Sequence, residues 1–352
     1  KNTALTNLLP VSRAIDPRHA HTLNSSHCTA LTFRDGAQSM WLQSMRQSFN
    51  PDTTDANELS SSVQGEIDPQ FQAYLREPPR ISYTQPEDPW FRRRLVSSLE
   101  AMLGRNKIEK TYYRLKESPF SISQFFGSAL REAGIRVELD QSKLAAIPRK
   151  GPLLFVANHP FGVVDGMVLC DIAAQVRGDL RIMLHSLLCQ DKQLAPYFLP
   201  IDFTQDKRAT KTNIRSKQLA LEYLSQDIPV LIFPSGTVST ANKFGFGEVE
   251  DAPWTTFAAK IIREAEATVV PIHFHGRNSR LFHVASHIAE PLRMALLVSE
   301  ALKKFGKTVE VDIGDPIPFE ELSTHESRQA LTDFLYGTVR DLGRDSQLRK
   351  AR

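Results

Sequence analysis

Short apolar runs alternate with longer amphipathic segments from about residue 150 to the end of the chain. The runs have the length of buried strands, and we expect strands at 153–157, 181–184, 230–233, 268–274 and 308–313. Apolar residues with helical spacing predict helices at 164–176, 207–225, 254–265, 291–305 and 324–342. This alternation indicates an α/β fold with a mainly parallel sheet flanked by helices.

The N-terminal part has a different pattern. Residues 1–85 are rich in Ser, Thr, Asn, Asp and Gln and predict a weakly ordered or accessory segment. In 89–116, apolar residues recur every three or four positions beside several arginines, which predicts a basic amphipathic helix, and a second helix is expected at 121–133. The first helix either lies on an anionic membrane surface or packs on the α/β domain. The predicted organisation is 1–85 accessory, 86–150 helical extension, 151–320 α/β domain and 321–352 C-terminal helix and tail.

Composition narrows the classes of protein to which the chain could belong. The net charge is +3, from 43 basic and 40 acidic residues, so the chain lacks the strong positive charge typical of polyanion-binding proteins. Its three cysteines are too few for a disulfide framework, which favours a reducing, cytoplasmic location. No apolar run reaches the roughly 18 residues of a spanning helix, so we expect at most a peripheral contact with the inner face of the cytoplasmic membrane. The chain begins with Lys1, which is compatible with a removed leader.

The first candidate for chemistry follows the predicted strand 153–157. That strand ends at Asn158 and His159, a Pro-Phe-Gly turn follows, and Asp165 stands at the start of the next helix. A histidine accepts a proton near neutral pH, and a carboxylate on its other nitrogen fixes the tautomer and stabilises the imidazolium. The spacing fits equally well a simpler arrangement, in which Asp165 caps the helix and His159 is a polar group at a strand end.

Three segments together carry a family resemblance. The segments are Asn158–Gly166, Phe233–Ser239 and Val269–Ile272, and they resemble the ordered blocks of the lysophospholipid acyltransferase (PlsC-like) superfamily over about residues 150–320. The sequence departs from the common pattern, which has four residues between His and Asp where five intervene here, and has Glu and Arg where Ser235 and Val238 stand. The His-Pro-x-Gly-x-x-Asp-Gly form resembles a bacterial branch that includes ornithine- and glycine-lipid O-acyltransferases and hemolysin-like proteins.

The resemblance implies an O-acyltransferase in membrane lipid synthesis. His159 would take the proton of a lyso-lipid hydroxyl as that oxygen attacks an acyl thioester, supplied by acyl carrier protein or coenzyme A, and Asp165 would orient His159. The family's third-block Arg is associated with an acceptor phosphate, so Val238 makes an aminolipid or other lyso-lipid more plausible than lysophosphatidic acid. No cofactor, metal or nucleic acid is expected. The candidate substrate-binding residues are Asn158, Phe161, Gly162, Gly166, Ser235, Gly236, Thr237, Arg277 and Asn278.

Two other functions stay open. A lipid-binding protein with this fold but no turnover would explain the altered third block. A serine hydrolase would use Ser235 with His159 and Asp165, although Ser235 lacks the Gly-x-Ser-x-Gly context that exposes such a nucleophile. The basic stretch 207–217 either receives an acidic donor carrier or is a solvated helix face. The pairs His273/His275 and His283/His287 have metal-like spacing but lack further ligands, which favours structural roles.

Overall fold

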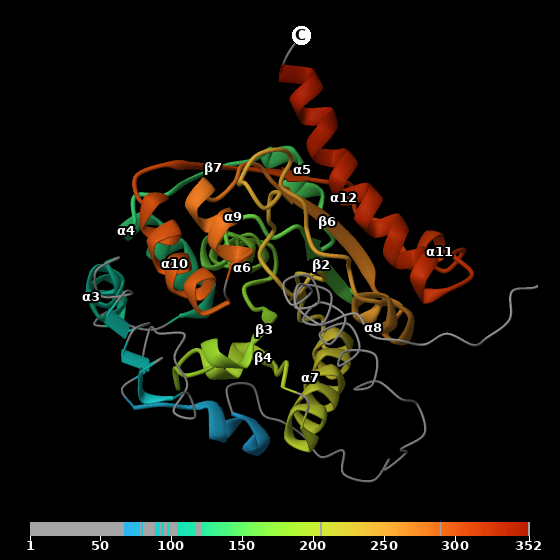
Figure 1. The fold of residues 1–352 in the computed structure, drawn as a ribbon. Helices are drawn as coiled ribbons and strands as arrows, with labels where there is room; N and C mark the ends of the chain where they lie inside the picture. Colours follow the sequence, from blue (N-terminus) through green and yellow to red (C-terminus); the bar gives the residue numbers. More distant parts are fainter. Residues whose placement is uncertain are drawn as a thin grey trace, which may run out of the picture. The chain divides into compact units, whose positions relative to one another are not determined.

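The fold is a mainly parallel sheet covered by helices on both faces. The computed structural model describes residues 67–77, 79, 89–91, 93–94, 97–98, 104–116, 121–204, 206–288 and 290–350. In this part of the chain a seven-stranded sheet has the order β1-β7-β6-β2-β5-β3-β4 (Figure 1). Only β6 and β7 pair antiparallel within it. The strands are β1 (Arg136–Glu138), β2 (Leu153–Ala157), β3 (Arg181–His185), β4 (Phe198–Ile201), β5 (Val230–Ile232), β6 (Thr268–Phe274) and β7 (Thr308–Ile313).

Helices connect most of these strands, as parallel pairing requires. The α-helices are α3 (Arg105–Lys116), α4 (Ile122–Glu132), α5 (Gln141–Ala146), α6 (Val163–Arg177), α7 (Lys207–Ser225), α8 (Phe257–Ala265), α9 (Arg280–Ser286), α10 (Glu290–Lys303), α11 (Phe319–Leu322) and α12 (Arg328–Lys350). Short 3-10 helices lie at Pro69–Tyr74 (η1), Ser186–Leu188 (η2) and Ala195–Tyr197 (η3). Among the described residues, no helix is both long and apolar enough to cross a bilayer.

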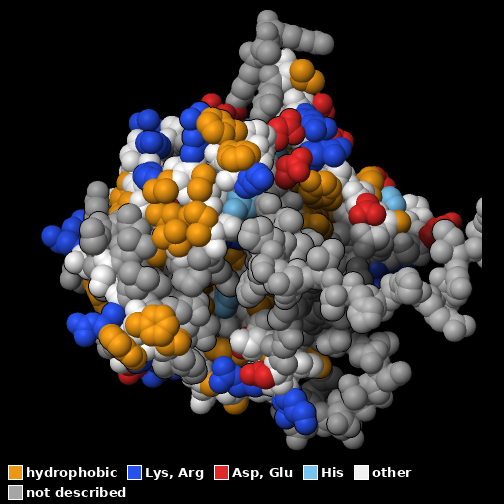
Figure 2. All heavy atoms as spheres, in the orientation of Figure 1, with side chains coloured by type: hydrophobic (Ala, Val, Ile, Leu, Met, Phe, Trp, Pro, Cys, Tyr) orange, Lys and Arg blue, Asp and Glu red, His pale blue; other side chains and the backbone are white. Residues whose placement is uncertain are grey.

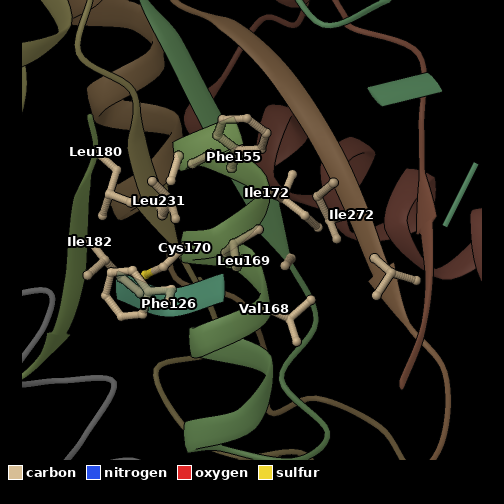
Figure 3. Close-up of a cluster of buried hydrophobic side chains, with 14 of the residues drawn as sticks. Phe126, Phe155, Val168, Leu169, Cys170, Ile172, Leu180, Ile182, Leu231 and Ile272 are labelled. Atoms are coloured by element: carbon tan, nitrogen blue, oxygen red, sulfur yellow. The ribbon is translucent and has the colours of Figure 1, made fainter. Parts of the chain in front are cut away.

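The alternation of side chains along β2 divides the core into two layers. Leu153, Phe155 and Ala157 belong to the cluster that includes residues of α4 and α6 (Figure 3). Leu154 and Val156 point to the opposite face and pack with residues of α7, α8 and α12. Successive side chains of a strand point to opposite faces of its sheet, so a strand buried on both sides reads as one continuous apolar run. Figure 1 shows these two sets of helices on opposite sides of the sheet.

The apolar runs predicted five strands in the right places, and two strands were missed. β1 is only three residues long and incompletely buried, and β4 contains Pro200, which weakens a strand pattern. The expected helix at 207–225 is present as α7, where the Asp206 side chain accepts the N–H of Ala209 at 2.7 Å.

Other helix boundaries differ from expectation. The predicted helix 89–116 is interrupted by a turn at Gly104, whose φ is +99°, and α3 begins after it. Four of the apolar residues that predicted this helix lie outside the described residues, namely Leu95, Leu99, Met102 and Leu103. Most of the accessory segment 1–85 also lies outside them. Helix α8 begins at Phe257 rather than Trp254. Trp254 lies in the preceding loop, where its indole N–H donates to Asp251 Oδ2 at 2.9 Å. The C-terminal helix spans 328–350 instead of 324–342.

The three candidate segments converge because of the strand order. Strands β6, β2 and β5 are parallel neighbours. Their carboxyl ends therefore lie at the same edge of the sheet, which is where ligands usually bind in open α/β sheets. His159, the loop at 235–237 and the loop at 276–278 follow these three ends.

Candidate active site

His159 and Asp165 lie in contact at the end of β2. His159 Nδ1 is 3.1 Å from Asp165 Oδ1, and the Asp165 side chain is fully buried whereas that of His159 is 17% exposed. The Nδ1 atom is itself buried and has no well-aligned hydrogen-bond partner among the described residues, so the contact is chiefly electrostatic. His159 is among the residues that line a cavity, and Nε2 is the ring nitrogen away from the Asp165 contact.

Asp165 also holds the turn that carries His159. Its Oδ2 accepts the backbone N–H groups of Phe161 at 2.8 Å and Gly162 at 3.3 Å, and its Oδ1 accepts that of Gly166 at 2.9 Å. These bonds compensate for burying a carboxylate, and they satisfy donors at the start of α6. The same carboxylate therefore caps the helix, as one of the two alternatives predicted, and also contacts His159.

His159 is fixed by contacts on both its ring and its backbone. The ring stacks on Phe233, with centroids 4.0 Å apart and planes 28° apart. Its N–H donates to Asp251 Oδ1 at 3.2 Å, and its carbonyl oxygen accepts the N–H of Ser239 at 2.8 Å. Such contacts restrict the imidazole to one orientation before substrate arrives.

Asp251 is a residue that the sequence analysis missed. Burial raises the pKa of its carboxyl, against the opposing effect of hydrogen bonds from the Ser239 hydroxyl, the Trp254 indole and the His159 N–H. The carboxyl links these groups into one network behind His159. A lone acidic residue in an irregular segment carries no periodic or motif signal, so the sequence offered no means of finding it.

The loop after β5 places Ser235 away from solvent. Ser235 is fully buried, and its hydroxyl donates to Thr237 O at 2.9 Å. Gly236 has a φ of +63°, and its N–H donates to Phe233 O at 2.9 Å. Gly236 and Thr237 line the same cavity as His159, whereas the buried Ser235 hydroxyl lacks the sharp exposure of a serine nucleophile.

Asn158 and Gly162 shape the turn around His159. The Asn158 amide donates to Phe274 O at 3.1 Å and accepts the Phe274 N–H at 2.7 Å, which joins the ends of β2 and β6. Gly162 has a φ of +91°, and a Cβ there would stand 3.2 Å from Leu297 Cδ2 and 3.3 Å from Val238 Cγ2. A side chain at this position would be both strained and crowded.

Phe161 and Asn278 pack behind the turn. A Cβ on Gly276, whose φ is +116°, would stand 2.8 Å from Phe161 Cζ, so glycine makes room for the ring. The Lys304 ammonium lies 3.7 Å from the centre of the same ring. The buried Asn278 amide approaches Phe161 O at 3.5 Å. Neither of these two predicted residues is among the described residues that line the cavity.

Arg277 is engaged outside the cavity. Its guanidinium donates to Gly247 O at 3.0 Å and to Gly245 O at 2.7 Å. The guanidinium therefore braces the loop 242–247, and Arg277 is not among the described residues that line the cavity. The role predicted for it in binding substrate receives no support from these contacts.

The histidines of the two pairs contact backbone or side-chain groups of the protein in the described part of the chain. Ala241 donates its N–H to His283 Nδ1 at 3.2 Å, and Ala241 O lies 2.8 Å from His287 Nε2. The two rings, four residues apart in sequence, thus contact both backbone polar groups of Ala241. Burial lowers the pKa of His283 to about 4, which keeps its ring neutral. His275 contacts Asp312 at 2.5 Å. No cluster of three metal-binding side chains occurs among the described residues.

The basic stretch on α7 is partly used in ion pairs. Arg215 contacts Asp68, which precedes η1, at 2.7 Å, and Lys217 contacts Glu264 of α8 at 2.8 Å. The Arg208 guanidinium lies 5.7 Å from the centre of the Tyr74 ring. These contacts favour a structural role for at least part of the stretch.

The cavity beside His159 is large and mainly apolar. Its volume is about 500 Å³. Six charged or titratable side chains line it among the described residues, namely Tyr112, His159, Cys170, His185, Asp191 and Arg293. Burial lowers the pKa of His185 to about 4, so that ring is neutral. Apolar lining residues come from several elements and include Ile108, Leu115, Phe125, Ala129, Met167, Leu184 and Leu297.

Three comparisons relate this chain to known proteins. A family model described as "Acyltransferase" matches residues 89–341. A lyso-glycine lipid O-acyltransferase of Phocaeicola vulgatus is 30% identical over 233 residues, which cover 64% of this chain and 80% of the relative. The lyso-glycine lipid O-acyltransferase of Bacteroides thetaiotaomicron is 31% identical over 234 residues, covering 64% and 81%. The crystal structure of the 1-acyl-sn-glycerophosphate acyltransferase PlsC from Thermotoga maritima superimposes with a TM-score of 0.42 at 19% identity, over 74% of this chain and 90% of that one.

Proposed function

Because the chain belongs to the acyltransferase family and is an O-acyltransferase, we propose that it transfers a fatty acyl group from an acyl thioester to a lyso-lipid hydroxyl. The observation that carries this proposal is the contact of His159 with Asp165 at the wall of an apolar cavity. A cavity of about 500 Å³ with this mainly apolar lining fits a hydrocarbon chain.

Each chemical step is assigned to a group of the site. His159 Nε2 accepts the hydroxyl proton as the acceptor oxygen bonds to the thioester carbonyl carbon. The negative charge of buried Asp165 stabilises the resulting imidazolium. When the tetrahedral intermediate collapses, the carbon–sulfur bond breaks and His159 returns its proton to the departing thiolate. No covalent acyl-enzyme is needed.

The oxyanion of the intermediate requires fixed donors. The N–H groups of Phe161 and Gly162 already donate to Asp165, and that of Gly236 donates to Phe233 O. Thr237 lines the cavity in the same loop. We therefore assign its backbone N–H to the oxyanion.

The acceptor proposed is a lyso-aminolipid. The third block has Val238 where the family resemblance places a phosphate-associated Arg. Two relatives are named lyso-glycine lipid O-acyltransferases, and a lyso-glycine lipid is the first acceptor to test. A lyso-ornithine lipid is the second. The acyl donor would be acyl carrier protein or coenzyme A thioester.

Reconstitution tests the proposal directly. We expect the purified full chain to convert lyso-glycine lipid into its O-acylated product when given labelled acyl-ACP or acyl-CoA, as detected by mass spectrometry. Lipid binding without product from either donor would contradict the proposal and favour a non-catalytic lipid-binding protein. Labelling of Ser235 by a fluorophosphonate, together with lipid hydrolysis and no transfer, would favour a serine hydrolase.

A membrane-facing surface is proposed around the loop 242–247 and α9. Figure 2 shows apolar side chains beside Lys and Arg on the face that carries α9 and α10. Lys243 lies 5.2 Å from the centre of the Phe244 ring, and Arg280 lies 4.2 Å from that of Phe246. Exposed apolar side chains flanked by cations suit the headgroup region of an anionic bilayer. Those side chains and their exposed fractions are Phe244 (64%), Phe246 (50%), Leu281 (60%) and Ile288 (70%).

Co-sedimentation with vesicles checks this surface. We expect Phe244→Ser with Phe246→Ser to weaken binding to anionic vesicles by about tenfold for each ring, because each partly buried phenyl group contributes on the order of 1.5 kcal/mol. Leu348→Ser is the matched control, since Leu348 is 64% exposed on α12. Equal binding by the double variant and the wild type would contradict the proposed surface. Transfer to a short, water-soluble acceptor should survive both changes.

A further inference from the structure

Asp251 holds the backbone of His159 through a closed ring of hydrogen bonds. Its Oδ1 accepts the His159 N–H at 3.2 Å and also the Ser239 hydroxyl. Ser239 in turn donates its own N–H to His159 O at 2.8 Å. Hydrogen bonds to a carboxylate are roughly twice as strong as those between neutral groups. Both backbone polar groups of His159 are therefore fixed by the same pair of residues, Asp251 and Ser239.

The Asp251 carboxylate is itself anchored to the core. Its Oδ2 accepts the Trp254 indole N–H at 2.9 Å. The Trp254 ring belongs to a buried layer of the core and packs edge-on against Tyr336, with centroids 5.5 Å apart. Beside Asp251, Glu250 forms an antiparallel bridge with Thr240, in which the two N–H to O distances are 2.9 and 3.1 Å. A carboxylate held in this way can serve as a fixed support for the groups that donate to it.

The same ring reaches the loop that carries the proposed oxyanion donor. Ser239 follows Thr237 by two residues, and the Thr237 N–H is the donor assigned above. Thr255, four residues after Asp251, donates its N–H to Pro234 O at 3.1 Å, just beyond the end of β5. Asp251 is not among the described residues that line the cavity, so an effect on catalysis must pass through its neighbours.

We propose that Asp251 is a positioning residue, which holds the backbone of His159 in place relative to the loop that carries the Thr237 N–H. This inference rests on the acyl transfer proposed above. A general base and an oxyanion donor act together only when one bound substrate can meet both. A displacement of about 1 Å at a reacting group can cost on the order of 10²-fold in rate. Asp251 holds the His159 backbone, whereas Asp165 contacts the His159 ring.

Replacing Asp251 by Ala should lower the single-turnover rate at saturating substrate by about 10- to 100-fold. The concentrations of acyl thioester and lyso-lipid that half-saturate this rate should stay unchanged, because the cavity wall is intact. Asp251→Asn should lose less than about threefold, because its amide oxygen can still accept from His159 and Ser239. The NH2 group of Asn then replaces only the contact with Trp254, and its cost falls on stability.

Double variants separate positioning from a general loss of structure. In protein that already carries His159→Ala, adding Asp251→Ala should change the residual rate by less than about twofold, because Asp251 acts through His159. Ser239→Ala opens the ring from its other side and keeps the carboxylate. It should lower the rate by about 3- to 10-fold, the loss expected for one hydrogen bond. The losses from Ser239→Ala and Asp251→Ala should not add, because both variants open the same ring.

Glu300→Ala is the matched control. Glu300 is also a buried carboxylate, it accepts the N–H and the hydroxyl of Ser279 at 2.8 and 2.5 Å, and it lies outside the cavity wall. This variant should melt at a lower temperature than the wild type and keep its rate.

Each outcome decides the inference. A folded Asp251→Ala protein with the wild-type rate overturns it, and so does a change confined to the half-saturating concentrations or a full loss in the His159→Ala background. If Asp251→Ala does not fold, a wild-type rate in Ser239→Ala overturns it and the predicted loss supports it. These results leave the acyl transfer itself standing. A wild-type protein that forms no product refutes the proposed function instead.

Discussion

Replacing His159 by Ala should lower the rate of acyl transfer by about 10²- to 10⁴-fold, the usual contribution of a general base. Because Nδ1 is buried against Asp165, Nε2 is the ring nitrogen proposed to take the proton. The affinity for the acyl thioester should change little, because the apolar wall is intact. Single-turnover assays with labelled acyl donor measure the chemical step directly.

The loss must be separated from a loss of structure. His159 stacks on Phe233, so the alanine variant leaves a gap there and its melting temperature should be measured. His159→Gln preserves more of the side-chain volume and should be equally inactive. His325→Ala is the matched control, since that ring contacts Phe334, whose neighbours are in the other core layer. A folded alanine variant with the wild-type rate would refute the proposed mechanism.

Replacing Asp165 by Asn should reduce both the rate and the stability. One carboxylate oxygen becomes an NH2 group that faces either His159 and the N–H of Gly166, or the N–H groups of Phe161 and Gly162. Unpaired buried donors cost about 1–3 kcal/mol of unfolding free energy. The imidazolium also loses its counter-charge, and in a serine protease triad the same change costs about 10⁴ in kcat. Chemical denaturation together with acyl-transfer assays measures the two effects.

The combination of effects distinguishes the two variants. We expect the stability loss to be larger for Asp165→Asn than for His159→Ala, because only the carboxylate accepts three backbone N–H groups. Asp171→Asn on the same helix is the matched control, since the Asp171 carboxylate accepts the Gln175 amide at 2.8 Å and lies outside the cavity wall. An inactive but fully stable Asp165→Asn protein would contradict the capping role.

The sheet was largely predictable because its central strands are buried on both faces. The run 153–157 is apolar throughout and 268–274 is mostly apolar, and the sequence placed both strands correctly. Strand β1 was not predictable, because at the sheet edge its three residues are held by pairing with β7 rather than by their own pattern. Gly104 illustrates the reverse case, where a helical pattern was interrupted by a residue free to adopt a positive φ.

Some residues of the candidate site could be predicted from the sequence and others could not. His159 and Asp165 could be found because they lie in one motif and their contact is local in sequence. Asp251 and Arg293 could not, because each contacts residues far from it in sequence, which include the His159 backbone for Asp251 and Val238 O for Arg293. Arg277 was expected near the substrate because it follows β6, but its guanidinium turns to Gly245 and Gly247. The position of a residue after a strand determines where its backbone lies, whereas a long side chain such as that of Arg277 can extend away from the site.

The contacts that hold the loop 242–247 affect the free energy with which this loop would bind the proposed membrane surface. Arg277 holds two of its carbonyl groups, and the two histidines His283 and His287 clamp Ala241 just before it. A segment that is already ordered does not lose backbone entropy when it meets a surface. Phe244 and Phe246 would then insert as a preformed wedge, with association controlled by salt-screened attraction and dissociation by the apolar area of the two rings.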